Sequence, residues 1–473
     1  MSRGLGDVYK RQPLDYTVTI CFMIIKKGGI NLMNTDSKQL TFKSFMAFTT
    51  PTMIMIVFLS LYTIIDGIFV SRFVGQNALS AINITLPLIS LTYGIAFMFA
   101  TGGSAIVAKK FGEGNSLEGK QNFSFIVLCS VIIGMFLMII ELTFLPNLLK
   151  LLGATENLYS YCYEYGFIIT LFTPIAILKS LFDYFMVTAN NPKLGLINTL
   201  IGGFTNMILD YVFIVVFNLG ISGAALATGI GLLIPSMIGS IYFMNQKNYL
   251  HFTKPKLKWD VLIQSMSNGL SEMVTNLSTA VTTLLFNLMM IKYLGEDGVA
   301  SITIVLYAQF LLMSVYLGFS SGAAPLISFS YGENNHPQLK QLIKYSYHFI
   351  SVASVVTFVL ALILASTIIK IFTGGETEVY HITKSGFYLF SFSFLPIGIN
   401  IFASAMFTAF SNGKVSALIS VLRSLILVII GVILLPILLG VNGIWLTIPF
   451  AEFITVVISI SLTKRYASYY HYE

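Results

Sequence analysis

The chain has 473 residues, of which 56% are hydrophobic and only 10% are charged. An ordinary soluble protein carries about 25% charged residues, and a soluble body of this size could not cover its surface with so few. The composition therefore excludes a soluble protein and predicts an integral membrane protein. The net charge of +7 does not indicate a nucleic-acid partner, because the basic residues are scattered between apolar stretches instead of gathering on one face.

Twelve apolar stretches are long enough to cross a bilayer, which takes about 20 mainly apolar residues in a helix. In the first half of the chain they cover 44–71, 79–108, 122–145, 161–189, 194–217 and 221–245. In the second half they cover 262–291, 299–329, 342–369, 380–410, 415–439 and 441–463. The pattern predicts an all-α polytopic membrane protein with twelve transmembrane helices.

The connections between these helices differ in basic residues from one side of the membrane to the other. Fifteen Lys and Arg fall on the side of both termini and five on the opposite side. By the positive-inside rule, this imbalance places both termini in the cytoplasm, and we expect the protein in the cytoplasmic (inner) membrane of a bacterium. The basic connection 246–261 is predicted to link two lobes, 44–245 and 262–464.

The two ends of the chain carry no predicted span. Residues 1–43 are expected to form a cytoplasmic N-terminal segment and residues 465–473 a C-terminal tail. We expect residues 1–32 to be non-native, with the natural start at Met33. The apolar run 17–25 is too short to span a bilayer, and the opening residues lack the layout of a signal peptide.

The two halves are related by an internal repeat with an offset of 220 residues. Without gaps, FVGQNALSAINI from Phe73 aligns with YLGEDGVASITI from Tyr293, and FGEGN from Phe111 aligns with YGENN from Tyr331. Each half holds six helices, an even number, so both halves begin on the same side of the membrane. Two parallel six-helix lobes are typical of secondary transporters, whose substrate path lies between the lobes.

Ionisable residues inside membrane spans are costly and are therefore functional candidates. On a helix, Pro51, Tyr62 and Asp66 fall within about 60° of one face, and Asn206 and Asp210 are stacked at i and i+4. The predicted topology puts Asp66, Asp210 and Thr228 at one depth. The predicted cation-coupling site comprises Asp66, Asp210, Asn206, Tyr62, Thr228 and Pro51.

The chemistry of this set suits either a proton or a sodium ion held at Asp66 and Asp210. Two carboxylates in a low dielectric share a proton, and hard oxygens also suit a small cation. At the repeat offset, Asp66, Asn206, Asp210 and Thr228 become Phe286, Ile426, Ile430 and Ile448. The scaffold thus repeats while the polar set does not. A buried hydrogen-bond cluster between helices is the alternative interpretation.

Other intramembrane charges are secondary candidates. Glu272 and Arg423 lie in the inner half of the second lobe, where they could form an ion pair or take part in transport. Lys179 and Asp183, at i and i+4, are expected to form a structural pair. Glu141, Glu164 and Glu452 receive no assigned role.

Several motifs, in this order, resemble the multidrug and toxic compound extrusion (MATE) exporters. In the first half they are Pro51 and Asp66 before FVG at 73–75, AKKFGEGN at 108–115, N-x-x-x-D at 206–210 and LGISGAALAT at 219–228. In the second half, GLSE at 269–272, LLFN at 284–287 and APLISFSYGENN at 324–335 are similar to the MepA-like bacterial branch. The resemblance covers about residues 40–465.

The resemblance implies two six-helix lobes in a V and export of cationic amphiphiles driven by inward proton or sodium flow. It implies that the six first-lobe residues match the family's cation site and that Glu272 matches an acid that some members carry in the seventh span. The tenth span, 380–410, lacks the acid of certain sodium-coupled members, which shifts the expected coupling to the first lobe.

We therefore predict a secondary active multidrug exporter. It would exchange cationic amphiphilic drugs for protons or sodium by alternating access, as a monomer in the lipid bilayer, without a cofactor, a resident metal or a nucleic-acid partner. One alternative is a flippase for lipid-linked oligosaccharides of the same superfamily, although only Lys179 and Arg423 are intramembrane bases. A polytopic membrane enzyme is the other alternative, but no nucleophile, metal or nucleotide motif supports it.

Overall fold

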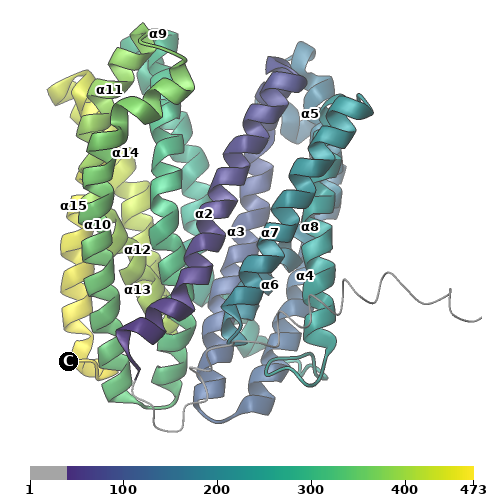
Figure 1. Cartoon of the computed structure of the whole chain (residues 1–473), viewed down its shortest axis with the longest axis vertical. Helices are drawn as coiled ribbons and strands as arrows, with labels where there is room; N and C mark the ends of the chain where they lie inside the picture. The colour runs from purple at the N-terminus through teal and green to yellow at the C-terminus, as the bar shows by residue number, and fades with distance from the viewer. Residues whose placement is uncertain (1–39) are drawn as a thin grey trace, which may run out of the picture.

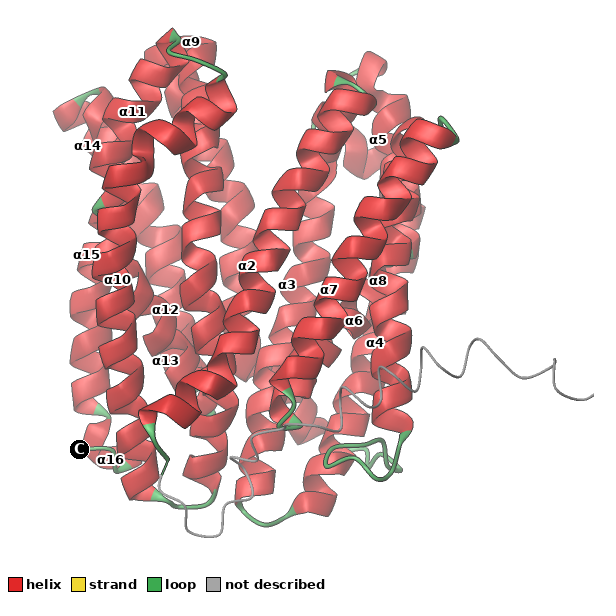
Figure 2. Ribbon diagram, viewed as in Figure 1, coloured by secondary structure: helices red, strands yellow, loops and turns green. Residues whose placement is uncertain are grey.

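The structure is a computed structural model that describes residues 40–473; the segment 1–32 predicted to be non-native lies outside the described residues. Figure 2 shows the described part as helices joined by short loops. The first half contains α2 (Phe42–Phe73), α3 (Gln76–Gly112), α4 (Ser116–Leu151), α5 (Glu156–Leu171), α6 (Thr173–Thr188), α7 (Pro192–Asp210), the π-helix η1 (Tyr211–Val216) and α8 (Gly220–Met244).

The second half repeats this order of elements. It contains α9 (Trp259–Gly332), α10 (His336–Thr373), α11 (Glu378–Ser391), α12 (Phe394–Ala409), α13 (Gly413–Val421), the π-helix η2 (Leu422–Ile426), α14 (Leu427–Leu439) and α15 (Val441–Arg465). A short helix, α16 (Ala467–Tyr470), follows. The connection between the halves, predicted at 246–261, runs from the end of α8 at Met244 to the start of α9 at Trp259.

Twelve membrane crossings account for the helices of the described chain. Nine helices are long and apolar enough to span a bilayer, and two more spans are bent pairs, α5 with α6 and α11 with α12, each bent by 53°. The 74-residue α9 would extend about 110 Å, far more than a bilayer requires. It breaks at Gly295 (φ 64°, ψ −150°), and the two parts supply two spans.

The helices form two lobes that converge at one end of the molecule and splay apart at the other (Figure 1). The convergent end, which we call the base, carries the C-terminus. One lobe contains α3 to α8 and the other α9 to α15 (Figure 1). The predicted all-α, two-lobed, V-shaped fold is confirmed by this arrangement and by the structural comparisons reported below.

Helix α2 belongs to both lobes. Near its start, the Phe45 ring packs edge-on against Phe319 of α9 at 5.6 Å and lies 6.4 Å from Tyr345 of α10. Farther along, its Phe58 ring contacts Phe204 of α7 at 5.5 Å. The helix therefore begins on the second lobe and ends within the first, as its course in Figure 1 shows.

The lobes contact each other at the base through glycines related by the repeat. A Cβ at Gly112 would overlap the carbonyl oxygen of Phe329, and a Cβ at Gly332 would overlap that of Lys109. Gly112 and Lys109 become Gly332 and Phe329 at the 220 offset, so the contact is reciprocal. Such reciprocity is the mark of an isologous, pseudo-two-fold interface.

Candidate functional site

A cavity of about 270 Å³ lies in the first lobe, in the half of the molecule away from the base. Its polar lining includes two acidic side chains, Asp66 of α2 and Glu141 of α4, and the hydroxyl of Thr228 on α8. The remaining lining is largely aliphatic and aromatic, with tyrosine rings from four positions: Tyr62, Tyr93, Tyr165 and Tyr307. Because Tyr307 belongs to α9, the cavity borders the second lobe. Among the described residues, no Lys or Arg lines it.

The two predicted first-lobe carboxylates lie together. The side chains of Asp66 and Asp210 are neighbours that interact with each other, and two carboxyl groups held together in a low-dielectric interior can share a proton. Asn206, one turn before Asp210, donates its amide to Thr228 Oγ1 at 3.5 Å. These four side chains therefore form one polar cluster at the edge of the cavity.

The cluster has free oxygen atoms. Asp66 Oδ1, Asn206 Oδ1 and Asp210 Oδ1 are buried and have no hydrogen-bond partner within the described chain. Buried polar atoms are normally satisfied, so each of these oxygens can accept a further ligand. Carboxylate and amide oxygens are the donors that hard cations prefer. The cluster thus fits either an additional proton or a small cation.

The helices bring these residues to one depth. Asp66 lies seven residues before the end of α2, Asp210 six residues before the end of η1, and Thr228 eight residues after the start of α8. At 1.5 Å per residue these intervals correspond to about 9–12 Å. Gly203 of α7 makes room for α2, because a Cβ there would lie 2.5 Å from the Phe58 ring.

A π-helical turn begins directly after Asp210, at Tyr211–Val216. Wide turns of this kind are frequent at functional sites, since they shift the register of a helix. The corresponding span of the second lobe contains η2, and Arg423 lies within it. Each lobe thus has a buried charged residue at a π-helical turn, a feature for which sequence offers no residue signature.

The structure separates Pro51 from the other five predicted residues. Tyr62 lies one turn before Asp66 and lines the cavity. Pro51 lies 15 residues before Asp66, about 22 Å along the helix, beside Thr49 and Thr52, which pack against Gly322 of α9. Pro51 therefore lies far from the carboxylates along α2, and its part in the cation-coupling site, which the resemblance implies, stays a prediction.

The predicted Lys179–Asp183 pair is present. The Lys179 Nζ to Asp183 Oδ2 distance is 2.6 Å, and each side chain is only 9% exposed. Asn198 and Thr199 of α7 also lie against the Asp183 carboxylate. These contacts fit a structural role in which the pair holds α6 against α7.

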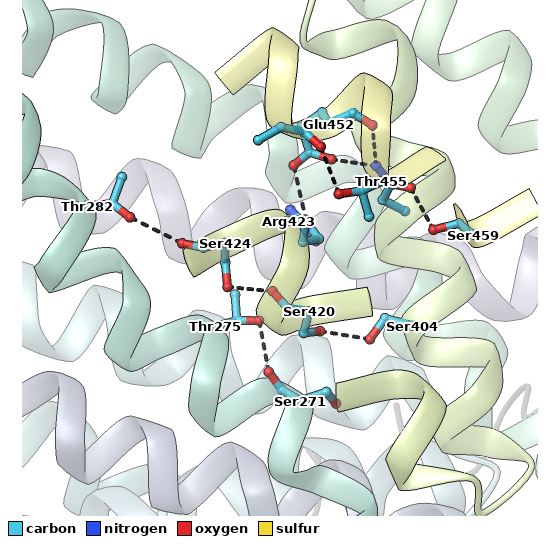
Figure 3. Close-up of polar contacts among 12 residues, drawn as sticks. Ser271, Thr275, Thr282, Ser404, Ser420, Arg423, Ser424, Glu452, Thr455 and Ser459 are labelled. Carbon is cyan, nitrogen blue, oxygen red and sulfur yellow. Dashed lines mark hydrogen bonds and ion pairs between the residues drawn. The ribbon is translucent and has the colours of Figure 1, made fainter. Parts of the chain in front are cut away.

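The predicted pairing of Arg423 with Glu272 is wrong. Arg423 Nε lies 3.1 Å from Glu452 Oε1 of α15, and the two side chains are 8% and 3% exposed. Glu452 Oε2 also accepts a hydrogen bond from Asn400 Nδ2 at 2.7 Å, and Ser459 donates to Asn400 Oδ1 at 2.8 Å. Figure 3 shows this network inside the second lobe. The sequence indicates the depth of Arg423 in the membrane, but it does not indicate which acidic residue at that depth is its partner.

Glu272 lies at the boundary between the lobes instead. It lines a small cavity of about 40 Å³ with Thr101 and Ser104 of α3, Tyr184 of α6 and Ser321 of α9. Tyr184 and Ser321 are joined across the lobes by a hydrogen bond of 3.4 Å. The charge of Glu272 therefore lies near contacts that hold the base together.

A chain of buried hydroxyls runs from this boundary into the second lobe. Consecutive oxygens are 2.8–3.0 Å apart along Thr408, Ser416, Ser404 and Ser420. Ser420 also accepts through its carbonyl oxygen from Ser424, as Figure 3 shows. The chain joins α12 to α13, and hydroxyl contacts of this kind stabilise helix pairs in membranes.

The cavity also contains an acid to which sequence reasoning assigned no role. Glu141 is 2% exposed, and its Oε2 accepts a hydrogen bond from Thr173 at 3.4 Å. Its Oε1 has no partner within the described chain. Its position in the middle of an apolar helix was the only sequence signal available.

Comparison with known protein families identifies the family of this chain. The family model MatE matches residues 51–212 and again residues 273–434. The chain belongs to the MatE family. The double match reproduces the internal repeat, and it confirms the predicted MATE family.

Relatives and solved structures agree with this assignment. Multidrug export protein MepA of Staphylococcus saprophyticus is 25% identical over 418 residues, covering 86% of this chain and 89% of the relative. The protein of the same name from Staphylococcus haemolyticus is 25% identical over 430 residues, covering 90% and 94%. These relatives are named as transporters and not as enzymes.

Two solved structures show the same fold. An outward-facing multidrug resistance MATE family transporter of the MOP superfamily is 20% identical with a TM-score of 0.86, covering 93% of this chain and 98% of that chain. A MOP superfamily transporter from Pyrococcus furiosus gives the same TM-score, identity and coverage. The two-lobed MATE fold is therefore shared over nearly the whole described chain.

Proposed function

We propose that this protein is a multidrug exporter that moves cationic amphiphilic compounds out of a bacterium in exchange for protons or sodium ions. It works as a monomer, with both termini in the cytoplasm and without a cofactor. The observation that carries the proposal is an apolar, tyrosine-lined cavity that contains two acidic side chains and, within the described chain, no basic one. The multidrug export named for the MepA relatives supports the export of drugs.

The lining of the cavity favours cations over the anionic lipids of a flippase. Tyrosine faces attract organic cations, and buried carboxylates supply a countercharge. A phosphate-bearing substrate would need Lys or Arg donors. Lys179 and Arg423 are instead both paired with carboxylates in the interior of their own lobes.

Ion coupling is assigned to the Asp66–Asp210 pair. Export against a gradient requires that ion and drug favour different conformations. Uptake of a proton or a small cation changes the charge of the pair directly beside the drug cavity. Asp66 lies on α2, which also packs on the second lobe through Phe45, so a change at the pair can alter how the lobes meet.

The test measures gradient-driven efflux in everted vesicles, energised first by a pH gradient and then by a sodium gradient. Asp66→Asn and Asp210→Asn should each lower the rate at least tenfold, because an amide keeps the volume but cannot exchange a proton. Glu164→Gln is the matched control, since this acid is exposed and, within the described residues, accepts hydrogen bonds from Ser160 and Ser222. Wild-type efflux by both Asn variants would disprove the assignment.

A further inference from the structure

We propose that Glu141 is the countercharge for the cationic group of the exported compound, distinct from the Asp66–Asp210 pair that takes the coupling ion. The inference rests on the proposed export of cations and assigns a residue to it. Glu141 is contributed by α4, whereas Asp66 lies on α2 and Asp210 at the end of α7. The cavity therefore has a second acidic wall built by a different helix.

The first argument is that one carboxylate oxygen of Glu141 has no hydrogen-bond partner in the described chain. Glu141 is 98% buried, and its Oε1 atom is shielded from solvent without a hydrogen-bond partner in the described chain. Leaving a buried carboxylate oxygen unpaired is costly. A partner supplied from the cavity removes that cost, and Glu141 is one of the residues lining the cavity.

The second argument is the surroundings. Thr170, Thr173 and Ala176, at the bend between α5 and α6, line the same cavity, and the Thr173 hydroxyl holds the Glu141 Oε2 at 3.4 Å. This bond fixes the carboxylate while its other oxygen stays free. The rings of Tyr93 and Tyr165 also line the cavity, and an aromatic wall beside a carboxylate suits a protonated or quaternary amine with apolar substituents.

The third argument is that the acidic residues have different surroundings and can therefore have different roles. Asp66 and Asp210 are interacting neighbours, so that pair can respond to a proton or a small ion. Among the residues that the structure describes, Glu141 has no acidic partner, and it bonds to a threonine. A lone carboxylate can therefore receive an organic cation while the pair titrates.

A structural alternative is available for Glu141. Thr173 is the first residue of α6, and a carboxylate close to a helix N-terminus stabilises the helix dipole. Under that alternative, Thr173→Val would be as harmful to ligand binding as Glu141→Gln, because both remove or weaken the contact between α4 and α6. Under our proposal, Thr173→Val keeps the charge and only loosens the carboxylate, so it weakens cation binding less than Glu141→Gln does.

The experiment is equilibrium binding of tetraphenylphosphonium, a permanent organic cation, to the purified full-length protein in lipid nanodiscs without an ion gradient. We expect Glu141→Gln to raise the Kd about tenfold, a shift of about 1.4 kcal/mol. Glu141→Asp should lie between this value and the wild type. Thr173→Val should lose less affinity than Glu141→Gln, and the exposed control Glu164→Gln should bind within twofold of the wild type.

The possible outcomes separate the two proposals. Failure of the wild-type protein to bind tetraphenylphosphonium would refute the proposed cation export itself. Normal binding by wild type with an unchanged Kd in Glu141→Gln would overturn only the role of Glu141, and so would equal losses in Thr173→Val and Glu141→Gln.

A second measurement covers the case in which Glu141→Gln does not fold. Dicyclohexylcarbodiimide modifies buried carboxyl groups, and mass spectrometry of the wild-type protein locates each adduct. We expect tetraphenylphosphonium to protect Glu141 from modification and to leave the exposed Glu164 unprotected. Equal modification of Glu141 with and without the cation would overturn the inference.

Discussion

At the scale of single residues, the second lobe illustrates how a membrane interior tolerates full charges. Arg423 pairs with Glu452, and the second oxygen of that carboxylate accepts from Asn400. These three residues come from three different elements, so the network fixes how η2, α12 and α15 pack. The exposed Lys370–Glu376 pair, with side chains 48% and 57% exposed, has no comparable surroundings and contributes little.

The buried pair predicts a double-mutant result. Arg423→Met leaves the Glu452 charge buried without its cation, and removing one partner of such a pair costs about 3–5 kcal/mol. Arg423→Met combined with Glu452→Gln removes both charges and keeps an acceptor for Asn400, so it should recover most of the loss. Thermal and denaturant unfolding of the purified protein measures both effects, with Lys370→Met as the exposed control. Wild-type stability in Arg423→Met would show that the pair is not structurally important.

At the scale of helices, the closed base depends on close contact between backbones. Gly102 and Gly269, like the Gly112 and Gly332 pair, lie where a Cβ would overlap backbone atoms of the facing helix. Backbone atoms cannot rotate away as a side chain can. A methyl group at these positions must therefore push α3 and α9 apart.

This packing predicts the effect of one methyl group. Gly332→Ala should separate the ends of α3 and α9, lower stability by about 1–3 kcal/mol, as overpacking does, and lengthen the distance between the lobes at the base. Spin labels at the exposed positions Leu117 and Lys340 report that distance by pulsed electron resonance. Gly375→Ala is the control, because nothing lies within 4 Å of its added Cβ. An unchanged distance distribution in Gly332→Ala would contradict this account of the base.

The helices were predictable from sequence to the extent that hydropathy determines them. Apolar length identifies the spans, and the 220-residue offset identifies the lobes. Hydropathy does not report backbone direction, so the bend between α5 and α6 and the π turns η1 and η2 were not predicted. Pro174 could indicate only a site for a kink, because proline at the start of a helix costs no hydrogen bond.

The candidate site was also predictable from the sequence only in part. Helical period and depth brought Asp66, Asp210 and Thr228 together, because each argument uses only one helix and the membrane surface. The position of Glu141 depends on how α4 turns toward the bend of α5 and α6, and the partner of Arg423 depends on how α15 packs. Both are relations between helices that sequence spacing cannot determine.

At the scale of the whole molecule, the V closes at the base and opens at the opposite end (Figure 1). The polar cluster and the first-lobe cavity lie in the open half, near the ends of α2 and η1 and the start of α8. The described base-side connections carry 14 Lys and Arg and those of the opposite side carry five, which by the positive-inside rule favours the proposed orientation with the base in the cytoplasm. In that orientation the cavity would face outward, and under the proposed exchange this structure would correspond to the state that releases drug and takes up the coupling ion.

This orientation predicts which positions a membrane-impermeant thiol reagent can reach in intact cells. In a background with Cys21, Cys129 and Cys162 replaced by serine, Gly375→Cys should be modified from outside, because it lies in the loop between α10 and α11 at the open end. The native Leu257 side chain is 71% exposed, but this residue lies in the connection at the base. Leu257→Cys should therefore react only after the membrane is permeabilised. Labelling of Leu257→Cys from outside, with protection of Gly375→Cys, would reverse the orientation and turn the open half toward the cytoplasm. The pair is informative because both positions are solvent-accessible in the folded protein, which leaves the membrane as the cause of any difference in reactivity.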